Sequence, residues 1–149
     1  MTKYNTPKTA LRTIAGITTL TAASVFFSSA TAANLTVTIA DVATAEGEIM
    51  LVIYDSENNF RKTETIATRK PAIKGNMVFS FPDLTAGDYA VMVFHDRNGN
   101  GELDTNLMGM PKEPWGGSLQ GKSVFGAPGW SDTRFELADD GTSITITLN

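Results

Sequence analysis

Short apolar runs that alternate with polar residues recur along the chain, and they limit its fold more than any other feature. Residues 35–40, 77–81 and 143–148 place an apolar side chain at every second position. Because successive side chains of a strand point to opposite faces, this period of two predicts strands with one buried face. Two denser apolar runs, 49–54 and 89–94, have strand length and predict central strands covered on both faces.

These runs predict an all-β fold. We expect a further strand at 133–137. The charged connection across 61–75 is typical of a protected edge strand, so the expected total is about seven short strands. No segment has a helical period, so we expect a single antiparallel β-sandwich, immunoglobulin-like or transthyretin-like. Tyr89 follows the turn at Gly87 and resembles the tyrosine corner of such sandwiches.

Residues 1–32 have the pattern of a secretory signal peptide. Lys3, Lys8 and Arg12 precede a mostly apolar stretch, and Ala30-Thr31-Ala32 forms an A-x-A cleavage site. The stretch is too short and too rich in Thr and Ser for a transmembrane helix. We therefore expect residues 33–149 to form one exported domain without a transmembrane segment, in the periplasm or outside the cell.

The charge and cysteine content restrict the partners of this domain. The chain has 16 acidic and 12 basic residues, and the three basic residues of the leader have no acidic counterpart there. The exported part is therefore strongly acidic, which argues against nucleic acid and anionic membrane surfaces as partners. The chain has 0 Cys, so it has neither a disulfide framework nor a cysteine nucleophile. This makes a bound metal ion a more attractive way to cross-link distant parts of the exported domain.

Oxygen-bearing side chains follow the run 89–94 with the spacing D-x-N-x-N-G-x-L-D. They match positions 1, 3, 5 and 9 of an EF-hand calcium loop, with the glycine at position 6 and a backbone carbonyl at 7. Position 12, normally a bidentate Glu, is Leu107, and the flanks are not helical, so we expect a weak calcium site outside an EF-hand, completed by Glu113 or water. The alternative is an Asx-rich turn that needs no metal. The predicted calcium ligands are Asp96, Asn98, Asn100, Glu102 and Asp104.

The segment from Asp96 to Asp132 is too long for an ordinary hairpin loop. It holds both tryptophans, Trp115 and Trp130, in a frame rich in Gly and Pro. One interpretation is a cover that packs on its own domain. The functional alternative is a platform in which Trp115 and Trp130 bind a carbohydrate or peptide ligand, or dock another protein.

Evidence for catalysis is sparse. His95 is the only histidine, and no G-x-S-x-G elbow accompanies it. A secreted hydrolase would have to combine His95 with a serine such as Ser118 or Ser123, or use the carboxylates of Glu102 and Glu113. This is the alternative to a non-catalytic module.

Three blocks of the sequence resemble one family. They are Gly87-x-Tyr89, then H-D-x-N-x-N-G-x-L-D over 95–104, then G-M-P-K-E-P-W-G over 109–116. Together they are similar to the DUF2141 family of exported bacterial proteins of unassigned function, over essentially all of the chain beyond the leader. Gly117 departs from the family, which tends to carry Phe there. The resemblance implies an exported bacterial β-sandwich, and we expect a non-catalytic binding or structural module with a calcium-braced loop.

Overall fold

The computed structural model describes residues 32–121 and 127–149, so the predicted signal peptide lies outside the described residues except for Ala32. The described elements are eight strands, one 3₁₀ turn and one helical turn. In chain order they are β1 (Ala32–Val42), β2 (Glu48–Tyr54), β3 (Ile66–Pro71), β4 (Gly75–Thr85), β5 (Gly87–Asp96), β6 (Trp115–Gly117), η1 (Ser118–Gln120), α1 (Trp130–Thr133), β7 (Phe135–Leu137) and β8 (Thr142–Thr147).

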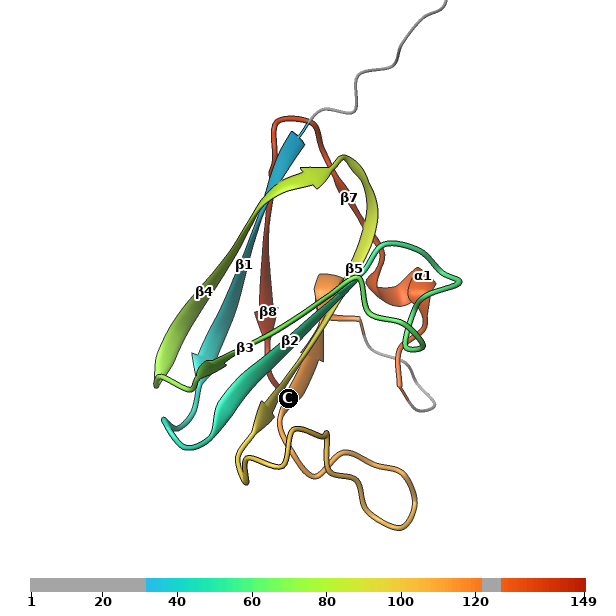
Figure 1. The fold of residues 1–149 in the computed structure, drawn as a ribbon. Helices are drawn as coiled ribbons and strands as arrows, with labels where there is room; N and C mark the ends of the chain where they lie inside the picture. Colours follow the sequence, from blue (N-terminus) through green and yellow to red (C-terminus); the bar gives the residue numbers. More distant parts are fainter. Residues whose placement is uncertain (1–31, 122–126) are drawn as a thin grey trace, which may run out of the picture.

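Two sheets form the fold, and they confirm the predicted all-β sandwich (Figure 1). One sheet has the order β4-β1-β8 and the other β3-β2-β5-β6, with β7 also paired to β5. The core lies between them, and the predicted period of two places its side chains there. Ile39 on β1, Ile49 on β2 and Val91 on β5 are all fully buried. None of the helices in the described residues is long and apolar enough to cross a membrane.

Three details differ from the sequence-based expectation. β1 and β8 pair in parallel, which is possible because they come from opposite ends of the chain and need no tight hairpin. β2 and β5 are central in their sheet, but Met50, Val52 and Met92 stay partly exposed on its outer face. Thr133 belongs to α1, where its hydroxyl donates to the Gly129 carbonyl (3.0 Å), and the last strand of that region begins only at Phe135.

The charged connection contains an edge strand, as predicted. β3 pairs only with β2, and Arg69 on β3 forms an ion pair with Glu48 (3.3 Å). Lys70 reaches across to the other sheet, where its Nζ donates to the Val78 carbonyl (2.8 Å) and lies 4.4 Å from the centre of the Phe79 ring. Basic side chains therefore protect this edge and tie the two sheets together on one side of the sandwich.

The opposite side is closed by β6, a strand that the sequence pattern did not reveal. Trp115 and Asn149 exchange backbone hydrogen bonds, at 3.3 Å and 2.9 Å, so β6 joins the end of the chain beyond β8. A Cβ at Gly116 would lie 2.7 Å from the Ile146 side chain, so this approach needs glycine. The segment between β5 and β6 consequently extends from one end of the sandwich (Figure 1).

The turn before β5 is the predicted tyrosine corner. The Tyr89 hydroxyl donates to the Thr85 carbonyl at 2.9 Å, and the ring is buried in the core. This contact fixes the start of β5, the strand that ends at the candidate site.

Candidate functional site

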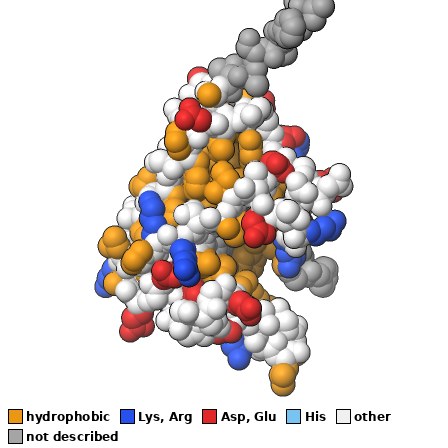
Figure 2. Space-filling view, viewed as in Figure 1, with side chains coloured by type: hydrophobic (Ala, Val, Ile, Leu, Met, Phe, Trp, Pro, Cys, Tyr) orange, Lys and Arg blue, Asp and Glu red, His pale blue; other side chains and the backbone are white. Residues whose placement is uncertain are grey.

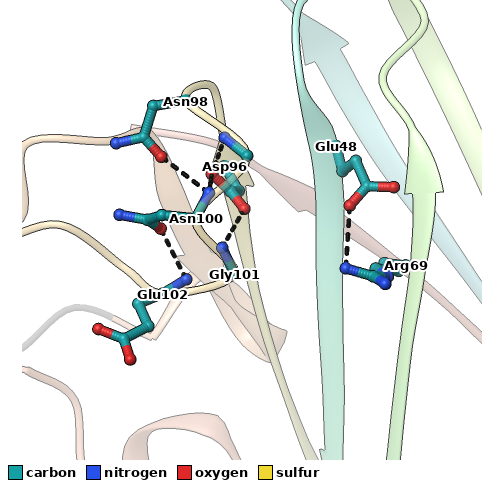
Figure 3. Close-up of polar contacts among 8 residues, drawn as sticks. Glu48, Arg69, Asp96, Asn98, Asn100, Gly101 and Glu102 are labelled. Atoms are coloured by element: carbon teal, nitrogen blue, oxygen red, sulfur yellow. Dashed lines mark hydrogen bonds and ion pairs between the residues drawn. The ribbon is translucent and has the colours of Figure 1, made fainter.

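Asp96, the last residue of β5, organises the loop that follows. Its fully buried carboxylate accepts backbone N–H bonds from Gly99 (2.7 Å), Asn100 (3.2 Å) and Gly101 (2.7 Å). Figure 3 shows the carboxylate with the loop backbone wrapped around it. Gly99 and Gly101 have φ of +73° and +80°, a region that glycine enters readily. A buried anion thus sets the loop conformation through backbone donors.

Asn98 and Asn100 each form an Asx turn. The Asn98 Oδ1 accepts the Asn100 N–H (3.0 Å), and the Asn100 Oδ1 accepts the Glu102 N–H (2.8 Å) (Figure 3). Their amide nitrogens both donate to the Asp104 carboxylate, at 2.6 Å from Asn98 and 3.2 Å from Asn100. The loop is therefore held by its own side chains, as the Asx-rich interpretation predicts.

The predicted calcium ligands are brought together, but their oxygens do not all face one point. The side chains of Asn98 and Asn100 converge on Asp104 through nitrogen rather than oxygen. In the described residues, no three His, Cys, Asp or Glu side chains gather as a potential metal site. A cation here would depend on the two Asn side chains, which would have to turn their oxygens toward it.

Glu113 holds both ends of the loop through hydrogen bonds to backbone N–H groups. It is 8% exposed, and its two carboxylate oxygens accept the N–H groups of Arg97 (2.9 Å) and Asp104 (3.1 Å). The sequence suggested Glu113 as an extra metal ligand, whereas both of its oxygens here hold backbone. This role joins Glu113 to two residues earlier in the same loop, and the spacing of the loop residues does not indicate it.

Gly47 supports the same region from the turn before β2. A Cβ on Gly47 would lie 2.0 Å from the Asp96 carbonyl oxygen, and its φ is +69°. The β1–β2 turn therefore packs backbone against backbone at the base of the loop. The sequence shows a glycine in a turn but gives no signal of this close approach.

Trp115 lies in a pocket beside the loop, as the ligand-platform hypothesis requires. The cavity is about 150 Å³ and mostly apolar. Arg61, from the charged connection between β2 and β3, adds one cationic side chain. We call this cavity the Trp115 pocket. Its walls include Arg61, Leu103, Thr105, Met110, Pro111 and Trp115.

Trp130 does not line the Trp115 pocket. It packs edge-to-face on Phe60, with ring centroids 5.8 Å apart, and Phe60 packs in the same way on Tyr54 at 5.2 Å. Burial raises the pKa of Tyr54, with a further contribution from the Glu64 carboxylate. The two tryptophans therefore lie in different places: Trp115 borders a cavity, and Trp130, the first residue of α1, belongs to an aromatic cluster with Phe60 and Tyr54.

His95 and Ser118, two of the residues proposed for hydrolysis, are both buried and do not meet. His95 is fully buried, and its Nε2 lies 2.6 Å from the Glu46 carbonyl, while Nδ1 has no partner. Ser118 is also fully buried; its hydroxyl accepts the Val91 N–H (3.0 Å) and donates to the Thr133 carbonyl. Val91 and His95 are four residues apart on β5, roughly 13 Å along the strand. Ser123 lies outside the described residues.

The fold and the site define a two-sheet β-sandwich whose longest loop is held by buried carboxylates and borders an apolar pocket. The chain belongs to DUF2141, described as an uncharacterized protein conserved in bacteria, whose family model matches residues 37–145. The match includes β2 to β7 and the whole loop, together with parts of β1 and β8. Comparison with curated proteins finds no match, and comparison with solved structures finds none.

Proposed function

We propose that this protein is an exported, non-catalytic binding module in which a calcium-braced loop supports the Trp115 pocket. The observation that carries the proposal is the continuity of the two features. Leu103 and Thr105 lie on either side of Asp104 and also line the pocket. Whatever fixes the Asp104 carboxylate therefore also fixes a wall of the binding site.

The charge of Asp104 supports a cation at this point. Its carboxylate accepts hydrogen bonds from two uncharged amide groups, and the ion pairs found in the described part of the chain, Arg69–Glu48 and Arg134–Asp88, lie elsewhere. A calcium ion would replace the two N–H donors, while Asn98 and Asn100 turned their oxygens inward. The Glu102 carbonyl and the Asp96 carboxylate would complete an oxygen shell of the type that calcium prefers.

The same contacts predict a weak affinity. Turning the two amides breaks the Asx-turn bonds from Asn98 to Asn100 and from Asn100 to Glu102. Two of the ligands are neutral, which lowers the attraction further. We expect a dissociation constant of about 0.1–1 mM, the range of extracellular calcium modules.

Thermal unfolding in calcium and in chelator tests the brace. At a calcium concentration about tenfold above the dissociation constant, linkage gives about 1.4 kcal/mol of stabilisation. Asp104→Asn should abolish the shift, and magnesium should not reproduce it because it demands a stricter octahedral geometry. An identical melting temperature in calcium and chelator would remove calcium from the proposal.

The pocket favours a ligand with an apolar face and one polar or anionic group. Trp115 offers an aromatic ring for a sugar face or an apolar side chain, and Arg61 offers hydrogen-bond donors beside it. The chain has 2 Trp, so Trp130→Phe leaves Trp115 as the only indole and keeps an aromatic ring against Phe60. Quenching of Trp115 fluorescence by oligosaccharides or peptides would report occupancy, and Arg61→Ala is the matched pocket variant.

The hydrolase alternative finds less support in the geometry. It requires either His95 or the loop carboxylates in contact with substrate, but the His95 ring is fully buried with its Nε2 2.6 Å from the Glu46 carbonyl, and both carboxylate oxygens of Glu113 accept backbone N–H groups. A direct measurement is hydrolysis of generic ester and glycoside substrates by the wild type and by His95→Gln. Turnover that disappears with His95 would support an enzyme instead.

Export is tested by cell fractionation and by N-terminal sequencing of the protein from the envelope. We expect the mature chain to start at Ala33, which is buried in β1 next to the predicted cleavage site. A protein that retains Met1 in the cytoplasm would contradict this part of the proposal.

A further inference from the structure

The Trp115 pocket carries a single charge on its wall. Among the described residues that line it, Arg61 is the only charged one, and none is acidic. The ion pairs and the cation–π contact found in the described part of the chain all involve other side chains. Arg61 is therefore neither paired with a described carboxylate nor stacked on Trp115, so a guest in the cavity can contact both the guanidinium group and the indole ring.

The backbone at Arg61 is in a conformation that favours glycine. Its φ is +58°, in the left-handed region that a residue with a side chain enters only at a cost. Backbone hydrogen bonds hold the turn: the Phe60 N–H donates to the Ser56 carbonyl (3.0 Å), and the Thr63 N–H donates to the Asn59 carbonyl (2.9 Å). An arginine at such a position points to a use for its side chain.

The carboxylates nearest to the pocket in the sequence are engaged elsewhere. Asp104 lies between the lining residues Leu103 and Thr105, but its carboxylate accepts the side-chain amides of Asn98 (2.6 Å) and Asn100 (3.2 Å). Both Glu113 oxygens accept backbone N–H groups. Neither carboxylate forms an ion pair with Arg61, so the charge on the pocket wall is complementary to a negative charge on a guest.

The size and polarity of the cavity restrict the rest of the guest. About 150 Å³ is well below the range of about 300–1,000 Å³ typical of drug-sized ligands, so the cavity suits a small molecule or the end of a chain. Arg61, Thr105 and the Trp115 indole are its only hydrogen-bonding side chains. A sugar would leave many hydroxyl groups without a partner, and a free amino acid would leave its ammonium group unpaired.

A polyanion does not fit the surroundings of the pocket. On the face shown in Figure 2, basic and acidic side chains are interspersed and form no continuous basic area. The whole chain has a formal net charge of -4, so its long-range field repels a highly charged ligand. A single negative charge, in contact with one arginine, matches this distribution.

We infer that the Trp115 pocket binds apolar carboxylates. The compact apolar group packs on the Trp115 ring, and the carboxylate accepts hydrogen bonds from the Arg61 guanidinium, whose planar fork matches the two oxygens. The inference rests on the proposed binding function of the pocket and names its ligand class. Two sources carry this chemistry: a free monocarboxylic acid, and the C-terminal residue of a peptide with an apolar side chain.

Matched acids and amides test the ligand class. In the exported protein carrying Trp130→Phe, Trp115 is the only indole, because the chain has 2 Trp. Its fluorescence is titrated with isocaproate and N-acetyl-leucine, and with the corresponding neutral amides, isocaproamide and N-acetyl-leucinamide. The acids should bind at least about tenfold more tightly than their amides, because a charge-assisted hydrogen bond is lost in the amides. Binding of isocaproate alone would identify free acids as the ligands, and binding of N-acetyl-leucine alone would identify peptide ends. Ligand-observed NMR repeats the comparison without relying on the indole.

Arg61→Gln tests the residue. It should weaken the two acids by about tenfold or more and leave the two amides unchanged, so that the preference for the acid disappears. Because Arg61 is exposed, the melting temperature should stay close to that of the wild type. Lys62→Gln removes the same charge from the next residue, which does not line the pocket, and should change no binding constant.

Three outcomes would overturn the inference. They are acids and amides that bind equally to the wild type, a preference for the acids that survives Arg61→Gln, and no binding of any of the four probes. The first two leave the pocket as a binding site for another class of ligand. In the third case, a response of Trp115 to neutral oligosaccharides would keep the proposed binding function and remove only the carboxylate.

Discussion

The carboxylate of Glu113 accepts a hydrogen bond from the backbone N–H of Asp104 at 3.1 Å. Its second oxygen holds the Arg97 N–H at 2.9 Å. One buried side chain thus joins the start and the end of the candidate calcium loop to the strand that follows it. The loop is consequently part of the folded domain rather than an independent surface excursion, and its stability can be tested by substitution.

Glu113→Ala should lower the free energy of unfolding by about 3–6 kcal/mol, because hydrogen bonds to a charged group contribute about 1.5–3 kcal/mol each and both are lost. Glu113→Gln, which keeps one acceptor, should lose roughly half as much. Chemical denaturation measures both. Glu57→Ala, in an exposed turn, is the control and should change stability by less than about 0.5 kcal/mol. Equal effects at positions 57 and 113 would contradict the bridging role.

Gly47→Ala should destabilise the protein by more than about 2 kcal/mol, since the new Cβ meets the Asp96 carbonyl and the residue has positive φ. Gly99→Ala is a closely matched control: its φ is +73°, but no atom lies within 4 Å of its Cβ. It should therefore show only the conformational cost, about 1–2 kcal/mol. The difference between the two melting curves isolates the close approach, and no difference would mean that the β1–β2 turn can move aside.

Tyr89→Phe should cost about 0.5–1.5 kcal/mol through loss of the bond to the Thr85 carbonyl. The phenol also predicts a pH dependence. Burial, and secondarily the Asp55 carboxylate, raises the pKa of Tyr89 above its ordinary 10.0. The folded state therefore holds this proton more tightly than the unfolded chain, so its contribution is complete below about pH 10 and is lost as the pH rises through the raised pKa. Wild type should lose stability in that window more steeply than Tyr89→Phe; parallel curves would exclude the effect.

Asn100→Asp distinguishes a calcium loop from a metal-free turn. The substitution replaces an amide donor 3.2 Å from Asp104 with a second carboxylate. In chelator it should destabilise the protein by about 1–2 kcal/mol through repulsion and a lost hydrogen bond. In calcium the added charge should raise affinity and bring stability to the wild-type level or above. Asn58→Asp, in an exposed turn, should respond equally in both buffers. A loss that calcium leaves unchanged would favour the turn.

The strands were predictable because alternation is a local property. Leu35, Val37 and Ile39 are buried as their spacing predicts, since neighbouring side chains of any strand face opposite ways. The place of Tyr89 after a glycine turn likewise predicted a tyrosine corner, and the structure identifies the Thr85 carbonyl as the partner of its hydroxyl. The expectation that β2 and β5 are covered on both faces was only partly right, because apolar composition does not show what lies above a sheet.

The candidate site was predictable in composition but not in arrangement. The sequence by itself determined that Asp96, Asn98, Asn100 and Asp104 would share one sharply turning loop, because each lies within reach of its neighbours along the chain. Only the tertiary structure decided that Glu113 bridges the loop, that Gly47 packs beneath Asp96, and that Arg61 joins Trp115 in a pocket. The contacts of Gly47 and Arg61 join segments that are distant in sequence, and those of Glu113 close the loop back on itself; they form only when the loop packs against the assembled sheets.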